Sequence, residues 1–201
     1  MEVAGFEHHP YRRKKAKDRR RNLITMKDHK TTAQQSLLVH AQSPEAYIFL
    51  GVRIKILLSS KDSGGQFSLI EGLMPPGGDG GLHLHTNEDE SMHLLEGELE
   101  VTIGERKFLL SSGESYFAPR NIPHRLRNLS QAPVRSLVLT TPGGFDKFIS
   151  QAGIRLMGGL TPPAELPTPH QMEKLLKLAE EFGIKIIAPP EPPQASNQTR
   201  R

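Results

Sequence analysis

The chain has 201 residues, of which 36% are hydrophobic, and it contains neither Cys nor Trp. This length allows one domain of ordinary size with extensions. The lack of Cys excludes disulfides and thiolate metal sites. A metal ion would therefore need nitrogen and oxygen ligands, which suit iron, manganese, cobalt, nickel, copper or zinc. No window approaches the ~18 consecutive apolar residues of a membrane span, so we expect a soluble, cytoplasmic protein with no membrane partner.

Basic residues are concentrated near the N-terminus. Residues 1–30 contain ten Lys/Arg and four Asp/Glu, a net charge of +6, whereas the whole chain carries +4. Residues 9–21 hold eight basic side chains without a hydrophobic period, which predicts a disordered tail. One interpretation is a nucleic-acid tether. Because no basic or stacking aromatic surface follows, we favour a solvated tail, or an upstream start codon before a natural Met26, and expect no nucleic-acid partner.

Short apolar runs separated by Gly, Pro and Ser turn clusters fill the middle of the chain. Many short strands with such regular punctuation indicate an antiparallel sandwich or barrel. No internal repeat is found, so we expect a single barrel. The predicted strands are Val52–Leu58, Phe67–Met74, Ser91–Leu95, Leu99–Ile103, Lys107–Leu110, Ser115–Phe117 and Val134–Leu139.

The C-terminal third has helical signals. Residues 144–152 are compatible with a short helix. A second helix is predicted from Thr168 as N-cap, with Pro169 in the first turn and Gln171 completing a capping box. Gly183 ends this helix, and the chain from Pro189 is expected to be an extended, mobile tail. An apolar stripe at helical spacing predicts packing against the barrel or a second subunit: Met172, Leu175, Leu176, Ala179 and Phe182.

Three histidines and a glutamate have the spacing of a metal site. His83 and His85 are two residues apart, so on a strand their side chains share a face. Glu90 follows an acidic turn and would re-enter on a strand beside them. His124 begins a later strand that a closed sheet can bring to the same place. Three imidazoles and one carboxylate suit a divalent transition metal and leave open positions for water, substrate or dioxygen.

These residues belong to two longer patterns that resemble the two motifs of the cupin superfamily. The patterns are Gly77-x5-His83-x-His85-x4-Glu90-x6-Gly97 and Gly113-x5-Pro119-x-Asn121-x2-His124-x3-Asn128. The family usually has Gly where Asn121 stands, and Asn also tolerates a left-handed turn. The resemblance implies an all-β fold, a cupin-type antiparallel β-barrel (jelly roll) with a C-terminal α-helical extension. It also implies metal ligation by the four residues already named. We expect a tail over 1–30, the cupin domain over 31–160, and a helix with a Pro-rich tail over 161–201.

Further segments resemble the bacterial quercetin 2,3-dioxygenase-like group of single-domain cupins. They are Phe49-Leu50-Gly51, Pro75-Pro76-Gly77-Gly78, Glu88-Asp89-Glu90, Leu94-Leu95-Glu96-Gly97-Glu98, Ala118-Pro119-Arg120-Asn121-Ile122-Pro123-His124 and Thr141-Pro142-Gly143-Gly144-Phe145. The resemblance implies a metal-dependent dioxygenase acting on a flavonol-like or other enol, with Glu90 as both ligand and general base. Side chains expected to line the substrate pocket are Met92, Leu94, Tyr116, Phe117 and Leu126.

Two other functions remain open. A metal-binding cupin could sense or bind a small molecule without catalysis. A sugar-processing isomerase or epimerase would need several basic residues in the cavity to hold phosphate, and the motif strands supply few candidates beyond Arg125 and Arg127. Both have the wrong strand parity relative to His124, so we favour the dioxygenase. Single-domain cupins commonly pair, so a homodimer is a further expectation.

Overall fold

The computed structural model describes residues 45–156 and 168–191. The predicted basic tail of residues 1–30 lies outside them. The strands are β1 (Glu45–Phe49), β2 (Val52–Leu58), β3 (Ser68–Met74), β4 (Leu82–His85), β5 (Asp89–Glu96), β6 (Glu98–Ile103), β7 (Arg106–Ser111), β8 (Ser115–Ala118), β9 (His124–Arg127), β10 (Val134–Thr141), β11 (Ile154–Arg155) and β12 (Ile184–Ala188). The helices are α1 (Phe145–Ala152) and α2 (Pro169–Glu181).

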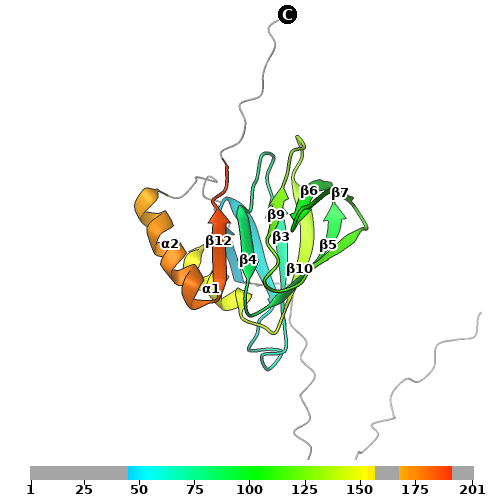
Figure 1. The fold of residues 1–201 in the computed structure, drawn as a ribbon. Coiled ribbons are helices and arrows are strands. Elements are labelled where there is room, and N and C mark those ends of the chain that lie inside the picture. Colours follow the sequence, from blue (N-terminus) through cyan, green and yellow to red (C-terminus); the bar gives the residue numbers. More distant parts are fainter. Residues whose placement is uncertain (1–44, 157–167, 192–201) are drawn as a thin grey trace, which may run out of the picture. The chain divides into compact units, whose positions relative to one another are not determined.

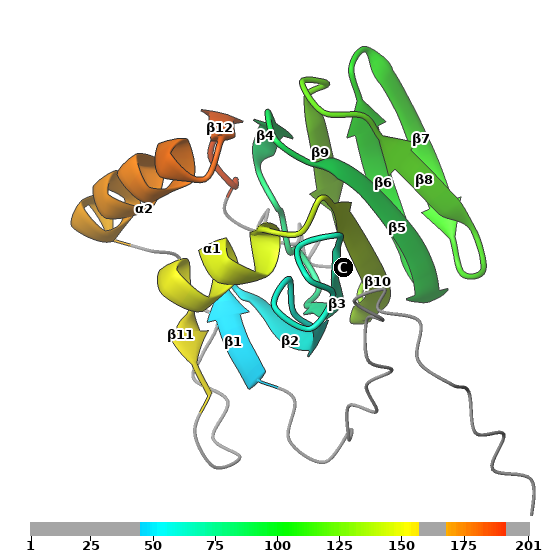
Figure 2. The same ribbon diagram turned by 90° about the horizontal axis from the view of Figure 1, so that it is seen from below.

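The strands form two antiparallel sheets that face one another (Figures 1 and 2). The larger sheet has the order β11-β1-β2-β3-β10-β5-β8, and the smaller has the order β12-β4-β9-β6-β7. In each sheet some neighbours are distant along the chain, such as β3 and β10 or β4 and β9, as in a jelly roll, in which strands cross between two sheets. The predicted all-β jelly roll is therefore confirmed, and it takes the form of a two-sheet sandwich.

Alternation along the strands explains where the core lies. In β3 and β10, every second residue is buried and the residues between are partly exposed, as the two-residue repeat of a strand requires. The inward side chains meet between the sheets and exclude water, which is the main source of stability for such a sandwich. The centre of this core is made by Ile54, Ile70, Met92, Leu94, Leu99, Val101, Val134 and Val138.

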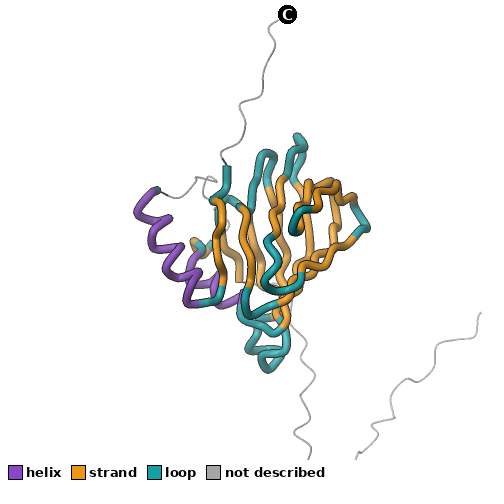
Figure 3. Tube along the Cα trace, in the orientation of Figure 1, coloured by secondary structure: helices purple, strands orange, loops and turns teal. Residues whose placement is uncertain are grey.

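Both helices lie on the same side of the sandwich (Figure 3). Helix α1 packs on β1 and β3 and also contacts α2, which lies beside β12. The predicted capping box is confirmed: the Thr168 hydroxyl accepts from the Gln171 amide at 3.3 Å, and the Gln171 side chain accepts from the Thr168 amide at 2.8 Å. In the apolar stripe, Leu175 is buried, whereas Leu176 is 40% exposed. No helix within the described residues has the length and apolar character needed to cross a membrane.

Strand β12 was not predicted. It pairs antiparallel with β4, placing Ile184 opposite His85 and Ile186 opposite His83. The expectation of a mobile tail from Pro189 is wrong as far as Glu191, because the Glu191 amide donates to Asp79 Oδ2 at 3.0 Å. The C-terminal segment is therefore part of the smaller sheet and covers the edge of β4.

Candidate metal centre

Three strands from the two sheets bring the four predicted ligands together. His83 and His85 lie on β4, and His124 lies directly opposite His83 on β9 in the same sheet. Glu90 lies on β5 in the other sheet, and its side chain is buried against the histidines. The turn before β9 places Asn121 at φ 65°, the left-handed conformation expected from the sequence. The cluster thus joins the inner faces of both sheets.

The distances between donor atoms suit a single ion. One donor atom from each of the four side chains lies within 4.8 Å of all the others. Glu90 Oε2 is 3.6 Å from His85 Nε2, and Glu90 Oε1 is 3.7 Å from His124 Nε2. Nitrogen and oxygen ligands bound ~2.1 Å from a shared ion lie about 3 to 4 Å apart. The cluster could therefore hold a divalent metal ion without a large rearrangement.

Each of the three imidazoles has a hydrogen-bond acceptor at Nδ1, so its Nε2 nitrogen is the one left for a metal ion. The Nδ1 atoms contact the Gly81 carbonyl oxygen at 3.1 Å (His83), Glu88 Oε2 at 2.9 Å (His85) and the Ile122 carbonyl oxygen at 3.2 Å (His124). An acceptor at Nδ1 fixes the proton there and leaves the Nε2 lone pair free, as in metal-binding histidines. The Nε2 atoms of His85 and His124 are buried without a hydrogen-bond partner. A metal ion would supply the partner that these atoms need.

Charges within the cluster are strongly coupled. Burial lowers the pKa of His83 to about 3, and the neighbouring imidazoles of His124 and His85 act in the same direction. Burial would also lower the pKa of His124, but the Glu90 carboxylate raises it overall. The pKa of Glu90 is lowered, because the imidazole charges outweigh the opposing effect of burial. His83 is thus neutral, and its Nε2 lone pair is available to a bound cation.

Two buried side chains outside the ligand set hold the ligands in place. Glu88 is 4% exposed and accepts from His85, as described above. Tyr116 donates its hydroxyl hydrogen to Glu90 Oε1. Burial and the Glu90 charge raise the pKa of Tyr116 well above its usual value, so the phenol remains a donor. A role for Glu88 was not predicted, because this residue lies in the turn before β5, where the alternation of a strand gives no signal.

A cavity of about 110 Å³ opens beside the cluster. His83 and Glu90 reach it, and Ser136 is the only other residue with a polar side chain in its lining. The apolar lining includes Phe49, Leu50, Val52, Ile54, Ile70, Met74, Leu99, Val138, Phe145 and Phe148. The cluster thus faces an almost wholly apolar space that contains no Lys or Arg within the described residues.

The predicted pocket residues divide into three groups. Met92 and Leu126 line the cavity, as expected. Leu94 and Tyr116 are buried but do not line it; Leu94 packs in the core. The assignment of Phe117 to the pocket is wrong, because its side chain is 56% exposed. Successive side chains of β8 point to opposite faces, and Tyr116 occupies the inner one.

The fold and the cluster together define a jelly-roll protein with a site that could hold a metal ion. Residues 71–140 match the family model Cupin_2, described as Cupin domain. Residues 71–140 of the chain therefore carry a cupin domain.

The relatives share only part of their length with this chain. The uncharacterized protein MJ1618 of Methanocaldococcus jannaschii is 31% identical over 75 residues, which are 37% of this chain and 60% of MJ1618. Quercetin 2,3-dioxygenase of Bacillus subtilis is 24% identical over 135 residues, 67% of this chain and 39% of that enzyme. Each match thus covers less than two thirds of the relative. Among solved structures, KdgF from Halomonas sp. has a TM-score of 0.49 and 20% identity, covering 56% of this chain and 98% of KdgF.

Proposed function

We propose that the protein is a metal-dependent dioxygenase that acts on a small, mainly apolar enol. The observation that carries this proposal is the position of the cluster: His83 and Glu90 open into an apolar cavity instead of facing bulk water. Apolar cavities with a few convergent polar groups are typical of small-molecule sites. The partial likeness to the Bacillus subtilis quercetin 2,3-dioxygenase supports the same reaction class.

Four residues would hold iron, manganese, cobalt, nickel, copper or zinc: His83, His85, Glu90 and His124. When bound, such an ion would act as a Lewis acid that favours the ionised form of a substrate hydroxyl and brings dioxygen to it. Glu90 would accept the hydroxyl proton as general base. Tyr116 donates to Glu90 Oε1 and so fixes the orientation of the carboxylate. The apolar lining excludes water from the enolate while it reacts.

The size of the cavity supports a substrate smaller than a flavonol. Pockets for drug-sized ligands have volumes of about 300–1,000 Å³, whereas this cavity has about 110 Å³. An engineered cavity of ~150 Å³ accommodates benzene. We therefore expect an enol with one ring, or with a chain of a few carbons.

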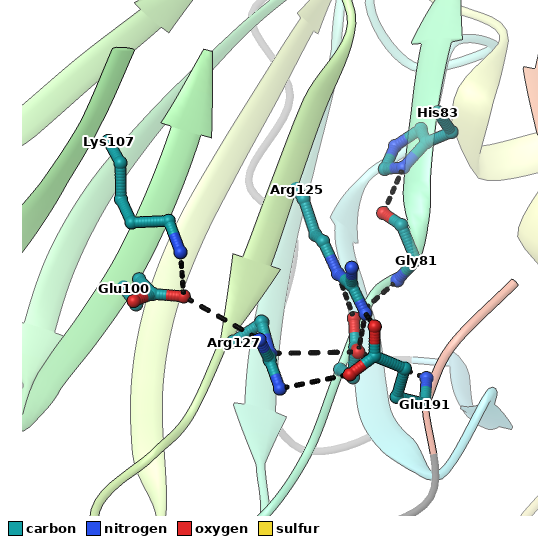
Figure 4. A network of polar contacts seen from close by, with 8 residues as sticks. Gly81, His83, Glu100, Lys107, Arg125, Arg127 and Glu191 are labelled. Carbon is teal, nitrogen blue, oxygen red and sulfur yellow. Dashed lines mark hydrogen bonds and ion pairs between the residues drawn. The ribbon is translucent and has the colours of Figure 1, made fainter. Parts of the chain in front are cut away.

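A sugar phosphate fits the cavity poorly. A buried phosphate needs cationic or amide donors, and the described lining contains no Lys or Arg. Arg125 and Arg127, the candidates from the sequence, lie outside the cavity lining and contact Asp79 and Glu191 (Figure 4). The remaining alternative is a cupin that binds a small molecule without turnover.

Oxygen consumption tests the proposal. The metal content per subunit would be measured first, and oxygen uptake then followed with small β-diketones, single-ring hydroxy-enones and a flavonol as the large member of the series. We expect uptake with the small enols and little with the flavonol. Glu90→Gln keeps the shape but removes the base, so turnover should fall by about a hundredfold or more at equal metal occupancy. Binding of enols by metal-loaded protein without oxygen uptake would overturn the dioxygenase proposal and favour the binding function.

A further inference from the structure

One wall of the cavity comes from the C-terminal segment, which lies beyond the residues that match the family model. The match ends at residue 140, but five lining residues follow it in α2, β12 and the adjoining chain: Met172, Leu175, Ile184, Ile186 and Pro190. We name the segment Pro169–Glu191 the C-terminal wall. One wall of the cavity is therefore formed by residues that lie outside the part of the chain that matches the family model.

The helical part of the wall has one face toward the cavity. Met172 and Leu175 are three residues apart, so they share a face of α2. Both line the cavity, whereas Leu176 is 40% exposed and does not. The capping box at Thr168 begins the helix one turn before Met172. The orientation of these side chains is thus set by local sequence.

The strand part of the wall is held directly against two predicted ligands. Ile184 pairs with His85 and Ile186 pairs with His83. Ile184 and Ile186 face the cavity, and Ile187 is 53% exposed on the other face, as alternation in a strand requires. An apolar molecule that reached the metal cluster would therefore meet these side chains.

Both ends of β12 are fixed. At the first end, the Thr86 amide donates to the Gly183 carbonyl oxygen at 2.7 Å. At the second, Glu191 Oε1 lies 3.0 Å from Arg125 Nη2, and Glu191 Oε2 accepts from Arg127 Nη2 at 3.2 Å (Figure 4). Because β12 is held at both ends, its distance from the metal cluster is fixed, and it can discriminate between bound molecules of different size.

We propose that the C-terminal wall sets the upper size limit for the molecule that the cavity accepts, with Met172 and Ile186 as the specificity-determining residues. Both side chains line the cavity and are only partly buried. Leu175 and Ile184 are more deeply buried, at 8% and 3% exposure, and belong to the core. Shortening Met172 or Ile186 should therefore enlarge the cavity with a smaller loss of core packing. This inference concerns the substrate of the proposed enzyme and rests on that function for its biological meaning.

Binding of apolar probes to metal-free protein tests the wall without requiring turnover. Benzene and naphthalene would be titrated by calorimetry into the wild type, Met172→Ala and Ile186→Ala. We expect the wild type to bind benzene and to bind naphthalene weakly. Each variant should bind naphthalene at least about tenfold more tightly, because it buries additional apolar surface of the larger probe. Ile186→Val shortens the side chain less, so the gain in affinity for naphthalene should be smaller. This variant replaces Ile186→Ala in the test if the alanine variant fails to fold.

Two matched controls lie on the same elements. Leu176→Ala on α2 and Ile187→Ala on β12 shorten side chains that are exposed and outside the cavity lining, so neither should change the binding of naphthalene. An equal gain in these controls would overturn the proposal, as would unchanged probe binding in folded Met172→Ala and Ile186→Val. A gain confined to the wall variants, together with no oxygen uptake from any enol, would support the wall and refute the dioxygenase. If the wall variants keep oxygen uptake and their preference for substrate size does not change, the dioxygenase proposal is supported and the role of the wall is refuted.

Discussion

Replacing Asp79 by Asn should destabilise the fold, because this carboxylate joins the loop before β4 to β9 and to the C-terminal wall. Its side chain is 3% exposed. Oδ1 accepts from the Gly81 amide at 2.8 Å and from Arg125 Nε at 3.0 Å. Oδ2 accepts from the Glu191 amide at 3.0 Å and from Arg125 Nη2. In Asn, one of these oxygens becomes an NH₂ group that faces hydrogen-bond donors.

The magnitude follows from the bonds that are lost. Hydrogen bonds to charged groups contribute about 1.5–3 kcal/mol each, and a buried partner left unsatisfied adds to the cost. Since Arg125 keeps some contact with Glu191, we expect the free energy of unfolding to fall by about 2–3 kcal/mol. For a domain of 150–250 residues this corresponds to a melting temperature lower by about 4–12 °C. Glu173→Gln removes an exposed ion pair with Lys177 on α2, and as a control it should cost no more than about 0.5 kcal/mol.

The pH dependence of stability shows whether the effect of Asp79→Asn comes from the lost charge or from the changed side chain. Burial raises the pKa of Asp79, but the hydrogen bonds from Arg125 and from the Glu191 and Gly81 amides outweigh it, so the folded-state pKa is lowered. The stabilisation is therefore present above the ordinary pKa of about 3.9 and is lost as the pH falls through the folded-state value. Thermal melts of metal-free wild type and Asp79→Asn, followed by circular dichroism, should begin to converge as the pH falls below about 4 and should coincide only below the lowered folded-state pKa. An equal difference in melting temperature at neutral and acid pH would refute the electrostatic reasoning. No difference at neutral pH would refute the claim that Asp79 stabilises the fold.

Three further outcomes are expected. His124→Ala should abolish stoichiometric metal binding without unfolding the sandwich, as measured by metal analysis and circular dichroism; full metal content would contradict the assigned site. Glu88→Ala should weaken metal affinity by about 10- to 100-fold, because the acceptor that orients His85 is lost; a competition titration with a chelator measures this, and unchanged affinity would exclude an orienting role. Gly183→Ala should destabilise the fold more than Gly65→Ala in thermal melts: both have positive φ, at 73° and 86°, but only at Gly183 would an added Cβ collide with the side chains of Asn87 and Thr86.

The sequence was sufficient for most strands of the sandwich and for the candidate ligands because both depend on local periodicity. Alternation in β3 and β10 identifies their inward residues without knowledge of the partner strand. The same two-residue repeat places His83 and His85 on one face, and spacing around turns adds Glu90 and His124. The start of α2 was equally predictable, since a capping box is a local interaction.

Other features depend on contacts between distant residues. Strand β12 carries a local signal, the β-branched run Ile184-Lys185-Ile186-Ile187. Its partner His85 precedes Ile184 by about a hundred positions, so this run does not reveal the strand with which it pairs. Tyr116 and Phe117 are both aromatic, and periodicity shows that they face opposite ways but not which is inside. The structure decides this through the buried hydrogen bond from Tyr116 to Glu90.

The C-terminal wall and the metal centre are linked through the backbone of the strand that carries two ligands. The Glu191 amide donates to Asp79, the Gly81 amide donates to the same carboxylate, and His83 Nδ1 contacts the Gly81 carbonyl oxygen (Figure 4). Without β12, β4 would be the edge strand of the smaller sheet, and an edge strand is held by one neighbour only. The position of His83 therefore depends on residues near the end of the described chain as well as on those of the cupin motif.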